Sequence, residues 1–164
     1  MLKKLLLIVA AGFFLASCAA TKTEQGGDAD ASSSASSSSS EGSINAGTQE
    51  DLIVNVGDRV FFEFDSSELT VDAQATLDAQ AAWLLQYSDT DITIEGHADE
   101  RGTREYNLAL GERRANSAKD YLMTYGISSD RISVISYGKE RPVDSGSTPL
   151  SWSKNRRSVT VKAN

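Results

Sequence analysis

The stretch IEGHADERGTREYNLALGERRANSAKDYLMTYG, Ile94 to Gly126, decides the fold. It opens at the end of a short alternation of apolar and polar residues, which predicts a strand over residues 91–97. The residues Gly96 to Asp99 indicate that this strand ends in a loop, and Gly102 is a second loop signal. A long helix is then predicted from about Arg104 to Tyr125, because the segment contains no proline.

One side of this predicted helix is apolar and should face a core. Asn107 and Arg114 fall on that same side, so an amide and a guanidinium project from the apolar face. A buried guanidinium is costly without a fixed anion, and Asp99 at the preceding strand end is a candidate partner. At about 100° per residue, the apolar positions that share one arc are Leu108, Leu110, Ala115, Ala118, Tyr121, Leu122 and Tyr125.

Residue types alone leave two interpretations of Asp99 and Arg114 open. In the first, they form an internal salt bridge that fixes the strand to the helix. In the second, they form a ligand clamp. An acid and a planar base held side by side would bind a zwitterion, because the acid takes an ammonium and the arginine fork takes a carboxylate.

The same residues also carry a resemblance to a known family. The chain resembles the peptidoglycan-binding signature of the OmpA-like domain family over about residues 54–164. In that family the aspartate and the arginine of the motif hold the two ends of meso-diaminopimelate in the peptidoglycan stem peptide. The resemblance therefore places this role on Asp99 and Arg114. The matching positions are the run Gly96 to Gly102, then Asn107, Leu110, Arg114, Ala115 and Leu122.

The resemblance also extends the expected binding site beyond this pair. His97 is expected to be a loop residue that hydrogen-bonds near the ligand. Asp65 ends a predicted strand as Asp99 does, and parallel strands that end together would bring both acids to one mouth. The full set of expected peptidoglycan-binding residues is Phe64, Asp65, His97, Ala98, Asp99, Asn107, Leu110 and Arg114.

The N-terminus has the layout of a bacterial lipoprotein signal. Two lysines precede an apolar run from Leu5 to Leu15, and small residues stand before Cys18, the only cysteine. The run is shorter than the roughly 20 residues that span a bilayer. We therefore expect residues 1–17 to be removed and Cys18 to be lipidated, with a plain secretory signal or an anchor helix as the alternatives. Ala19 implies, by the family's sorting rule, lipid-anchored residence in the outer membrane with the domain facing the periplasm.

A lipid anchor narrows the resemblance to those lipoproteins of the family that act in the Tol system. The implied role is to link the outer membrane to the cell wall, in envelope integrity and cell division. The implied partners are peptidoglycan of the diaminopimelate type, the outer membrane, and TolB with other Tol proteins.

The whole chain has a net charge of -7, and this charge is unevenly distributed along the sequence. Residues 18–95 hold 15 acids and 2 bases, whereas residues 96–164 hold 8 acids and 12 bases. A nucleic acid would require a broad basic stripe, so the acidic balance argues against that partner. Residues 18–53 are rich in serine, alanine, glycine and acids, and we expect a disordered tether there.

Strands and helices alternate in the predicted domain, residues 54–164. The order is β-α-β-α-β-β, an α+β fold in which helical crossovers imply partly parallel pairing in a mixed sheet with helices on one face. The resemblance implies the same fold. The further predicted elements are a strand Val60–Phe64 with its alternate residues buried, a helix from Thr70 to about Ser88, a strand 132–137 expected at the centre of the sheet, one helical turn at 150–154 and a strand 157–162.

Enzymatic classes are not supported by the residues present. One histidine and no free cysteine leave no expected metal site. None of the 23 acids is singled out as half of a glycosidase pair. We therefore expect no enzymatic activity and no cofactor. The remaining alternative is a protein-binding lipoprotein in which Arg114 is purely structural, and the resemblance implies that the β-propeller protein TolB docks near the same mouth.

Overall fold

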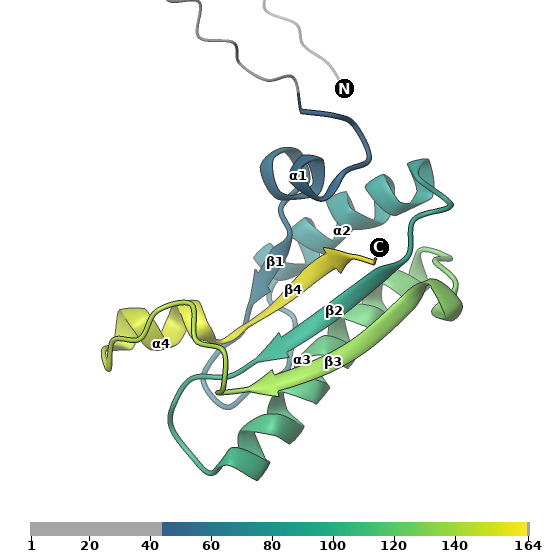
Figure 1. Cartoon of the computed structure of the whole chain (residues 1–164). Coiled ribbons are helices and arrows are strands. Elements are labelled where there is room, and N and C mark those ends of the chain that lie inside the picture. The colour runs from purple at the N-terminus through teal and green to yellow at the C-terminus, as the bar shows by residue number, and fades with distance from the viewer. Residues whose placement is uncertain (1–43, 164) are drawn as a thin grey trace, which may run out of the picture. The chain divides into compact units, whose positions relative to one another are not determined.

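The computed structural model describes residues 44–163, which are organised around one four-stranded sheet (Figure 1). The strand order is β1-β4-β2-β3. β2 and β3 pair in parallel, whereas β4 is antiparallel to both β1 and β2. The predicted α+β fold with a mixed sheet is confirmed. The strands are β1 (Arg59–Phe61), β2 (Ile92–His97), β3 (Ile132–Gly138) and β4 (Arg157–Lys162).

Two long helices, α2 (Val71–Gln86) and α3 (Arg104–Thr124), cover one face of the sheet (Figure 1). Each begins after a threonine, Thr70 or Thr103, whose hydroxyl accepts a hydrogen bond from a main-chain N–H of the first turn. The apolar side chains between the helices and the sheet form the core. They include Val60, Phe62, Leu77, Ala81, Leu84, Ile92, Ile94, Ala115, Ala118, Leu122 and Ile132.

Two facing glycines let α3 approach β2 closely. A Cβ placed on Gly96 would lie 1.8 Å from the main-chain oxygen of Gly111. A side chain on Gly96 therefore has no room between β2 and α3. Arg114 lies almost one turn further along α3. The close approach therefore places its side chain beside the end of β2, where it reaches the carbonyl oxygen of His97.

The position of β3 corrects an expectation from the sequence. Its apolar pattern suggested a central strand, but β3 lies at an edge because β4 inserts between β1 and β2. Ile132 is buried against the helices, whereas Ile135 points to the other face and is 40% exposed. Apolar residues on both faces of a strand thus did not mean that both faces are covered here.

The first strand is shorter than predicted and ends at Phe61. Phe62 is buried as expected, but Phe64 is 61% exposed and belongs to the following loop. That loop turns at Asp65, whose φ of 54° lies in the left-handed region. Aspartate tolerates this conformation better than most residues, so the turn can form at this position.

The folded part begins before residue 54, so the tether predicted for residues 18–53 is too long at its C-terminal end. A short helix, α1 (Gln49–Asp51), continues into a π-helical turn, η1 (Leu52–Val56), and Leu52 is completely buried in the core. The Asp51 carboxylate accepts hydrogen bonds of 2.8 Å from Gly47, Asn55 and Trp83. One acid and one leucine fix this segment, too few to give a sequence periodicity.

Two short helical elements complete the described chain. A 3-10 turn, η2 (Ser129–Arg131), precedes β3, and α4 (Pro149–Asn155) confirms the predicted helical turn before the last strand. No helix within residues 44–163 combines the length and the apolar character needed to cross a membrane. The predicted signal peptide and Cys18 lie outside the described residues.

Candidate ligand-binding site

A pocket of about 160 Å³ lies where the loops after β1 and β2 meet the start of α3. β1 and β2 are both antiparallel to β4, so they run in the same direction. Their carboxyl ends therefore lie on the same side of the sheet. The structure thus brings the predicted residues together, except that His97 and Ala98 do not line the pocket. The lining residues are Phe64, Asp65, Asp99, Arg101, Gly102, Tyr106, Asn107, Leu110 and Arg114.

Arg114 is completely buried, yet it contributes to the pocket wall. Its guanidinium donates to three main-chain carbonyl oxygens, those of Ser66 at 2.8 Å, His97 at 2.8 Å and Glu63 at 3.1 Å. Two of these acceptors lie in the loop after β1 and the third at the end of β2. Arg114 therefore fixes both walls of the pocket as well as lining it.

The charge of Arg114 has no ion-pair partner within 4.0 Å among the described residues. Burial, together with repulsion from Arg156, lowers the pKa of Arg114 to about 10. The guanidinium still remains protonated at neutral pH. Of its five N–H groups, the three hydrogen bonds to carbonyls leave two for another acceptor.

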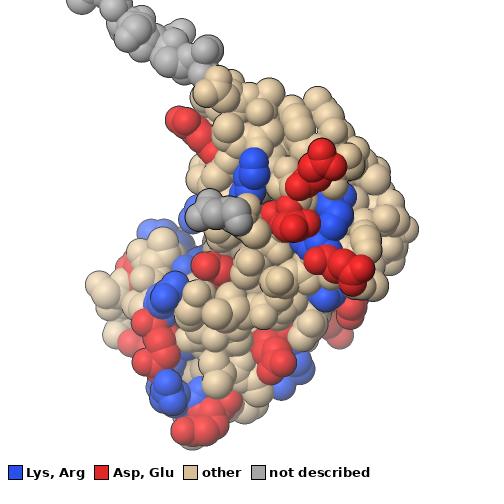
Figure 2. Space-filling model, turned by 45° about the vertical axis from the view of Figure 1, so that its right-hand side comes forward, with Lys and Arg blue, Asp and Glu red and all other residues tan. Residues whose placement is uncertain are grey.

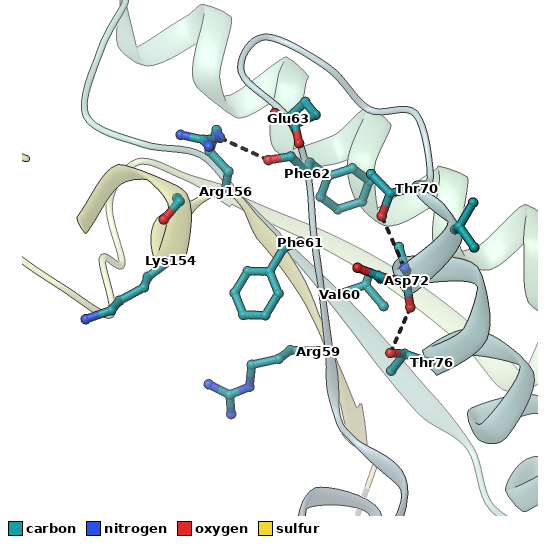
Figure 3. Close-up of a pocket in the computed structure, with 13 residues that line it drawn as sticks. Arg59, Val60, Phe61, Phe62, Glu63, Thr70, Asp72, Thr76, Lys154 and Arg156 are labelled. Carbon is teal, nitrogen blue, oxygen red and sulfur yellow. Dashed lines mark hydrogen bonds between the residues drawn. The ribbon is translucent and has the colours of Figure 1, made fainter. Parts of the chain in front are cut away.

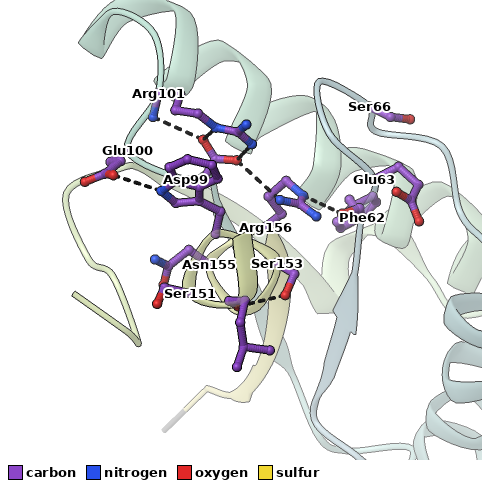
Figure 4. A network of polar contacts seen from close by, with 12 residues as sticks. Phe62, Glu63, Ser66, Asp99, Glu100, Arg101, Ser151, Ser153, Asn155 and Arg156 are labelled. Atoms are coloured by element: carbon purple, nitrogen blue, oxygen red, sulfur yellow. Dashed lines mark hydrogen bonds and ion pairs between the residues drawn. The ribbon is translucent and has the colours of Figure 1, made fainter. Parts of the chain in front are cut away.

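Asp99 is held by cations other than Arg114, so the first of the two interpretations, an internal salt bridge between these two residues, is wrong. Arg101 forms a two-pronged pair with the Asp99 carboxylate at 2.7 and 3.1 Å, and Arg156 lies 3.5 Å away (Figure 4). Burial raises the pKa of Asp99. The hydrogen bonds from Arg101 and the charge of Arg156 outweigh this effect, so the net pKa lies below its usual value.

Arg101 is itself held between two aromatic rings, which sequence reasoning missed. Its guanidinium carbon lies 4.2 Å from the ring centre of Phe64 and 4.1 Å from that of Trp152 on α4. The Trp152 indole N–H donates to the Glu100 carboxylate at 2.8 Å, which fixes this ring. Trp152 lies 51 residues beyond Arg101 in sequence, and the only local signal was an aromatic residue in a segment rich in proline and serine.

The other polar residues of the pocket mainly hold its loops in place. The Tyr106 hydroxyl donates a hydrogen bond to the Asp65 carboxylate, which joins α3 to the loop after β1. The Asn107 side chain is 2% exposed and donates to the carbonyl oxygen of Arg101 at 2.8 Å. Asn107 therefore stabilises the loop after β2, and we assign its amide no free contact to a ligand.

His97 does not have the predicted place in a loop beside the ligand. It is the last residue of β2, its ring is buried, and neither ring nitrogen has a hydrogen-bond partner among the described residues. Burial and the charges of Arg157 and Arg141 lower its pKa to about 4. His97 contributes to the site through its carbonyl oxygen, which accepts from Arg114. The neighbouring Ala98 is buried and its N–H donates to Gly138.

A second, larger groove of about 710 Å³ follows β1 between the start of α2 and α4 (Figure 3). It is lined by the exposed Phe61 and by charges of both signs, including Asp72 and Lys154. None of the predicted binding residues lines it. Because no buried charge without a partner faces this groove, the smaller pocket is the better candidate for a charged ligand.

The described residues offer no metal site, and the face in Figure 2 shows no basic stripe. Residues 44–163 contain no group of three or more histidine, cysteine, aspartate or glutamate side chains that could hold a metal ion. On the face that Figure 2 shows, basic and acidic side chains are interspersed in small groups.

A profile of the OmpA family matches residues 61–156. The chain is 58% identical over 120 residues to the peptidoglycan-associated lipoprotein of Rhizobium meliloti, covering 73% of this chain and 68% of that protein. It is 42% identical over 118 residues to the protein of the same name from Pseudomonas aeruginosa, covering 72% and 70%. The matched residues thus include the last residue of β1 and every element from α2 to α4.

Solved structures agree with the fold. The crystal structure of the peptidoglycan-associated lipoprotein from Burkholderia pseudomallei is similar with a TM-score of 0.63 and 40% identity, covering 65% of this chain and 90% of that one. The C-terminal domain of Helicobacter pylori MotB is similar with a TM-score of 0.60, covering 65% and 84%, but at 22% identity it supports the fold alone.

Proposed function

We propose, since the chain belongs to the OmpA family and, within it, to the peptidoglycan-associated lipoproteins, that it binds peptidoglycan non-covalently. The proposed binding site is the pocket beside Arg114. The ligand group is the diaminopimelate of the stem peptide, whose free end carries an ammonium and a carboxylate. The domain thereby links an outer-membrane lipid anchor to the cell wall. No step in this role requires an enzymatic activity or a cofactor.

The buried charge of Arg114 is the observation that carries the proposal. Its hydrogen-bond partners are neutral carbonyl groups, and no carboxylate of the described chain lies within 4.0 Å of it. A guanidinium that is taken out of water gains most from an anion that arrives with good geometry. A ligand carboxylate in the pocket would accept the two remaining N–H groups and neutralise the charge.

Asp99 supplies the opposite charge on the same pocket. A ligand ammonium paired with Asp99 and a carboxylate paired with Arg114 would place both ends of one amino-acid group on fixed partners. Lysine at the same position of the stem peptide keeps the ammonium and lacks the carboxylate. The proposal therefore includes selectivity for diaminopimelate over lysine, because the lysine form leaves the Arg114 guanidinium unpaired.

The same surface also suits a protein partner of the Tol system. Phe64 and Tyr106 are 61% and 45% exposed at the mouth, and Arg101 is partly accessible between them and α4. Aromatic and arginine side chains are the types that dominate protein interfaces. We therefore include docking of TolB near this mouth in the proposal, with cell-wall and protein binding in competition for it.

The test is binding of the unlipidated chain, residues 18–164 with Cys18→Ser, to isolated stem peptides of the diaminopimelate and lysine types. Titration calorimetry should show binding of the first and a loss of at least about 30-fold with the second, which corresponds to roughly 2 kcal/mol. Arg114→Lys should abolish the preference, because an ammonium cannot offer two parallel donors to a carboxylate.

Arg113→Ala is the matched control, because this substitution removes an equal charge from the exposed side of the same helix. It should bind as the wild type does. Equal affinity for the two peptides in the wild type, or wild-type binding by a folded Arg114→Lys variant, would show instead that Arg114 is only structural.

A further inference from the structure

The Asp99 carboxylate is already occupied by a cation of the chain itself. Arg101 reaches it with Nε at 3.1 Å and Nη2 at 2.7 Å, and the Arg101 main-chain N–H adds a third bond at 3.1 Å. Asp99 is 5% exposed, so little of the carboxylate is open to water or to a ligand while the Arg101 guanidinium is there. Figure 4 shows the two side chains face to face.

We propose that Arg101 is an internal competitor for the ligand: its guanidinium occupies Asp99 in the free domain, and a ligand ammonium binds Asp99 by replacing it. This inference rests on the proposed function, because it assumes that Asp99 receives an ammonium. In this role Arg101 lowers the affinity of the pocket for any ligand ammonium that must replace it at Asp99.

The exchange at Asp99 is close to balanced or unfavourable by itself. An incoming ammonium gains a pair with Asp99, but the two-pronged guanidinium pair is lost, and so are the contacts of Arg101 with the rings of Phe64 and Trp152. A ligand with an ammonium alone therefore gains little. A zwitterionic ligand adds a carboxylate contact to Arg114, and this second contact makes binding favourable.

The two rings also favour the position of Arg101 on Asp99 in the free domain. Phe64 comes from the loop after β1 and Trp152 from α4, and Trp152 is fixed by its hydrogen bond to Glu100. Three separate segments thus meet on one guanidinium. Release of Arg101 would change the surroundings of the Trp152 indole, whereas Trp83, buried beside Asp51, would be unaffected.

The experiment compares Arg101→Ala with the wild type, both in the unlipidated chain, by titration calorimetry with the two stem peptides. Removing the competitor should tighten binding of both peptides by the same factor of roughly ten, since the exchange at Asp99 is common to them. The lysine peptide should become measurable. Arg104→Ala is the control, because Arg104 is an exposed neighbouring cation paired with Glu140, and it should change neither affinity.

A second readout follows the two tryptophan indole N–H signals by NMR during the titration. The Trp152 signal should shift on binding to the wild type and not in Arg101→Ala, while the Trp83 signal stays in place in both. Arg101→Gln, which keeps a neutral donor beside Asp99, guards against loss of folding in the alanine variant and should tighten binding by an intermediate factor.

Each outcome is decisive. Weaker or unchanged binding by a folded Arg101→Ala variant overturns the competitor role, and weaker binding would make Arg101 a direct ligand contact. If the wild type binds the diaminopimelate peptide and only this result fails, the proposed function stands alone. If neither the wild type nor any variant binds either peptide, the proposed function fails and this inference fails with it.

Discussion

Asp99 and Arg114 line the same pocket, yet no ion pair joins them, because Asp99 is bound to Arg101 and Arg114 to three carbonyl groups. Two opposite charges are thus fixed independently of each other. A ligand that carries both charges can bridge them without breaking a bond between them. An internal salt bridge between Asp99 and Arg114 would instead have to break before such a ligand could pair with both.

Replacing Arg114 by alanine should lower the free energy of unfolding by about 3 kcal/mol, because three carbonyl groups lose their donor inside the fold. Urea unfolding measures this directly. Arg113→Ala should stay within about 0.5 kcal/mol of the wild type. If Arg114→Ala were as stable as the wild type, the three hydrogen bonds would have no structural role.

Leu52→Ala should destabilise the domain by about 2 to 5 kcal/mol, since a fully buried leucine leaves a cavity when truncated. Its neighbour Ile53 is 46% exposed and provides the control, with a much smaller loss expected. Limited proteolysis should cut before residue 44 and not between 44 and 54. Equal stability of the two variants would mean that this segment belongs to the tether and not to the folded domain.

Gly96→Ala should cost about 3 kcal/mol or more, because the new Cβ meets a main-chain atom of α3 that cannot turn aside. Gly126→Ala is the matched control. Gly126 has a positive φ of 86° but open space around it, so only the conformational penalty of about 1 kcal/mol applies. Thermal unfolding of both variants checks the difference, and a mild effect at Gly96 would contradict the close approach of β2 and α3.

Stability should fall as the pH drops from about 6.5 to about 4, the window set by the lowered pKa of His97. The folded protein keeps His97 neutral there, while the unfolded chain takes up a proton, so protons favour unfolding. The slope should reach at most about 1.4 kcal/mol per pH unit, with a total near 3 kcal/mol. Urea unfolding across this range checks it, and His97→Phe should flatten the profile. An unchanged slope in that variant would assign the effect to other groups.

Cys18→Ser should abolish lipid attachment and membrane sedimentation while leaving binding to isolated peptidoglycan unchanged, since the proposed lipidation of Cys18 makes the acyl chains the only membrane anchor. Fractionation of wall-free membranes followed by a peptidoglycan pull-down measures both properties. Retention of the serine variant in those membranes would point to a different anchor.

Local patterns in the sequence were sufficient for the elements, and less so for their arrangement. The long proline-free segment from about Arg104 to Tyr125 predicted α3 almost to the residue. The edge position of β3 could not be predicted, because which strand pairs with which depends on where β4 inserts, and no local pattern encodes that. The start of the fold depends on the side chains of Asp51 and Leu52, which show no periodicity.

The site divides in the same way. A charge on the apolar face of a helix identified Arg114, and the loop after a strand identified Asp99. Their actual partners could not be inferred, since Arg114 binds main-chain carbonyls that every residue possesses. Trp152 on α4 contacts Arg101, and the two residues are too far apart in sequence for a local spacing pattern to predict the contact.

The attachment of the N-terminal segment determines how the domain would respond to mechanical force. Asp51 ties the segment to Trp83 on α2, and the Gln49 side chain bonds to the main chain of Thr160 and Lys162 on β4. A pull applied along the chain at residue 44 is therefore shared between a helix and an inner strand before it reaches β1. The short edge strand, which would peel first under tension, would thus be shielded from the pull between membrane and wall that the proposed function implies.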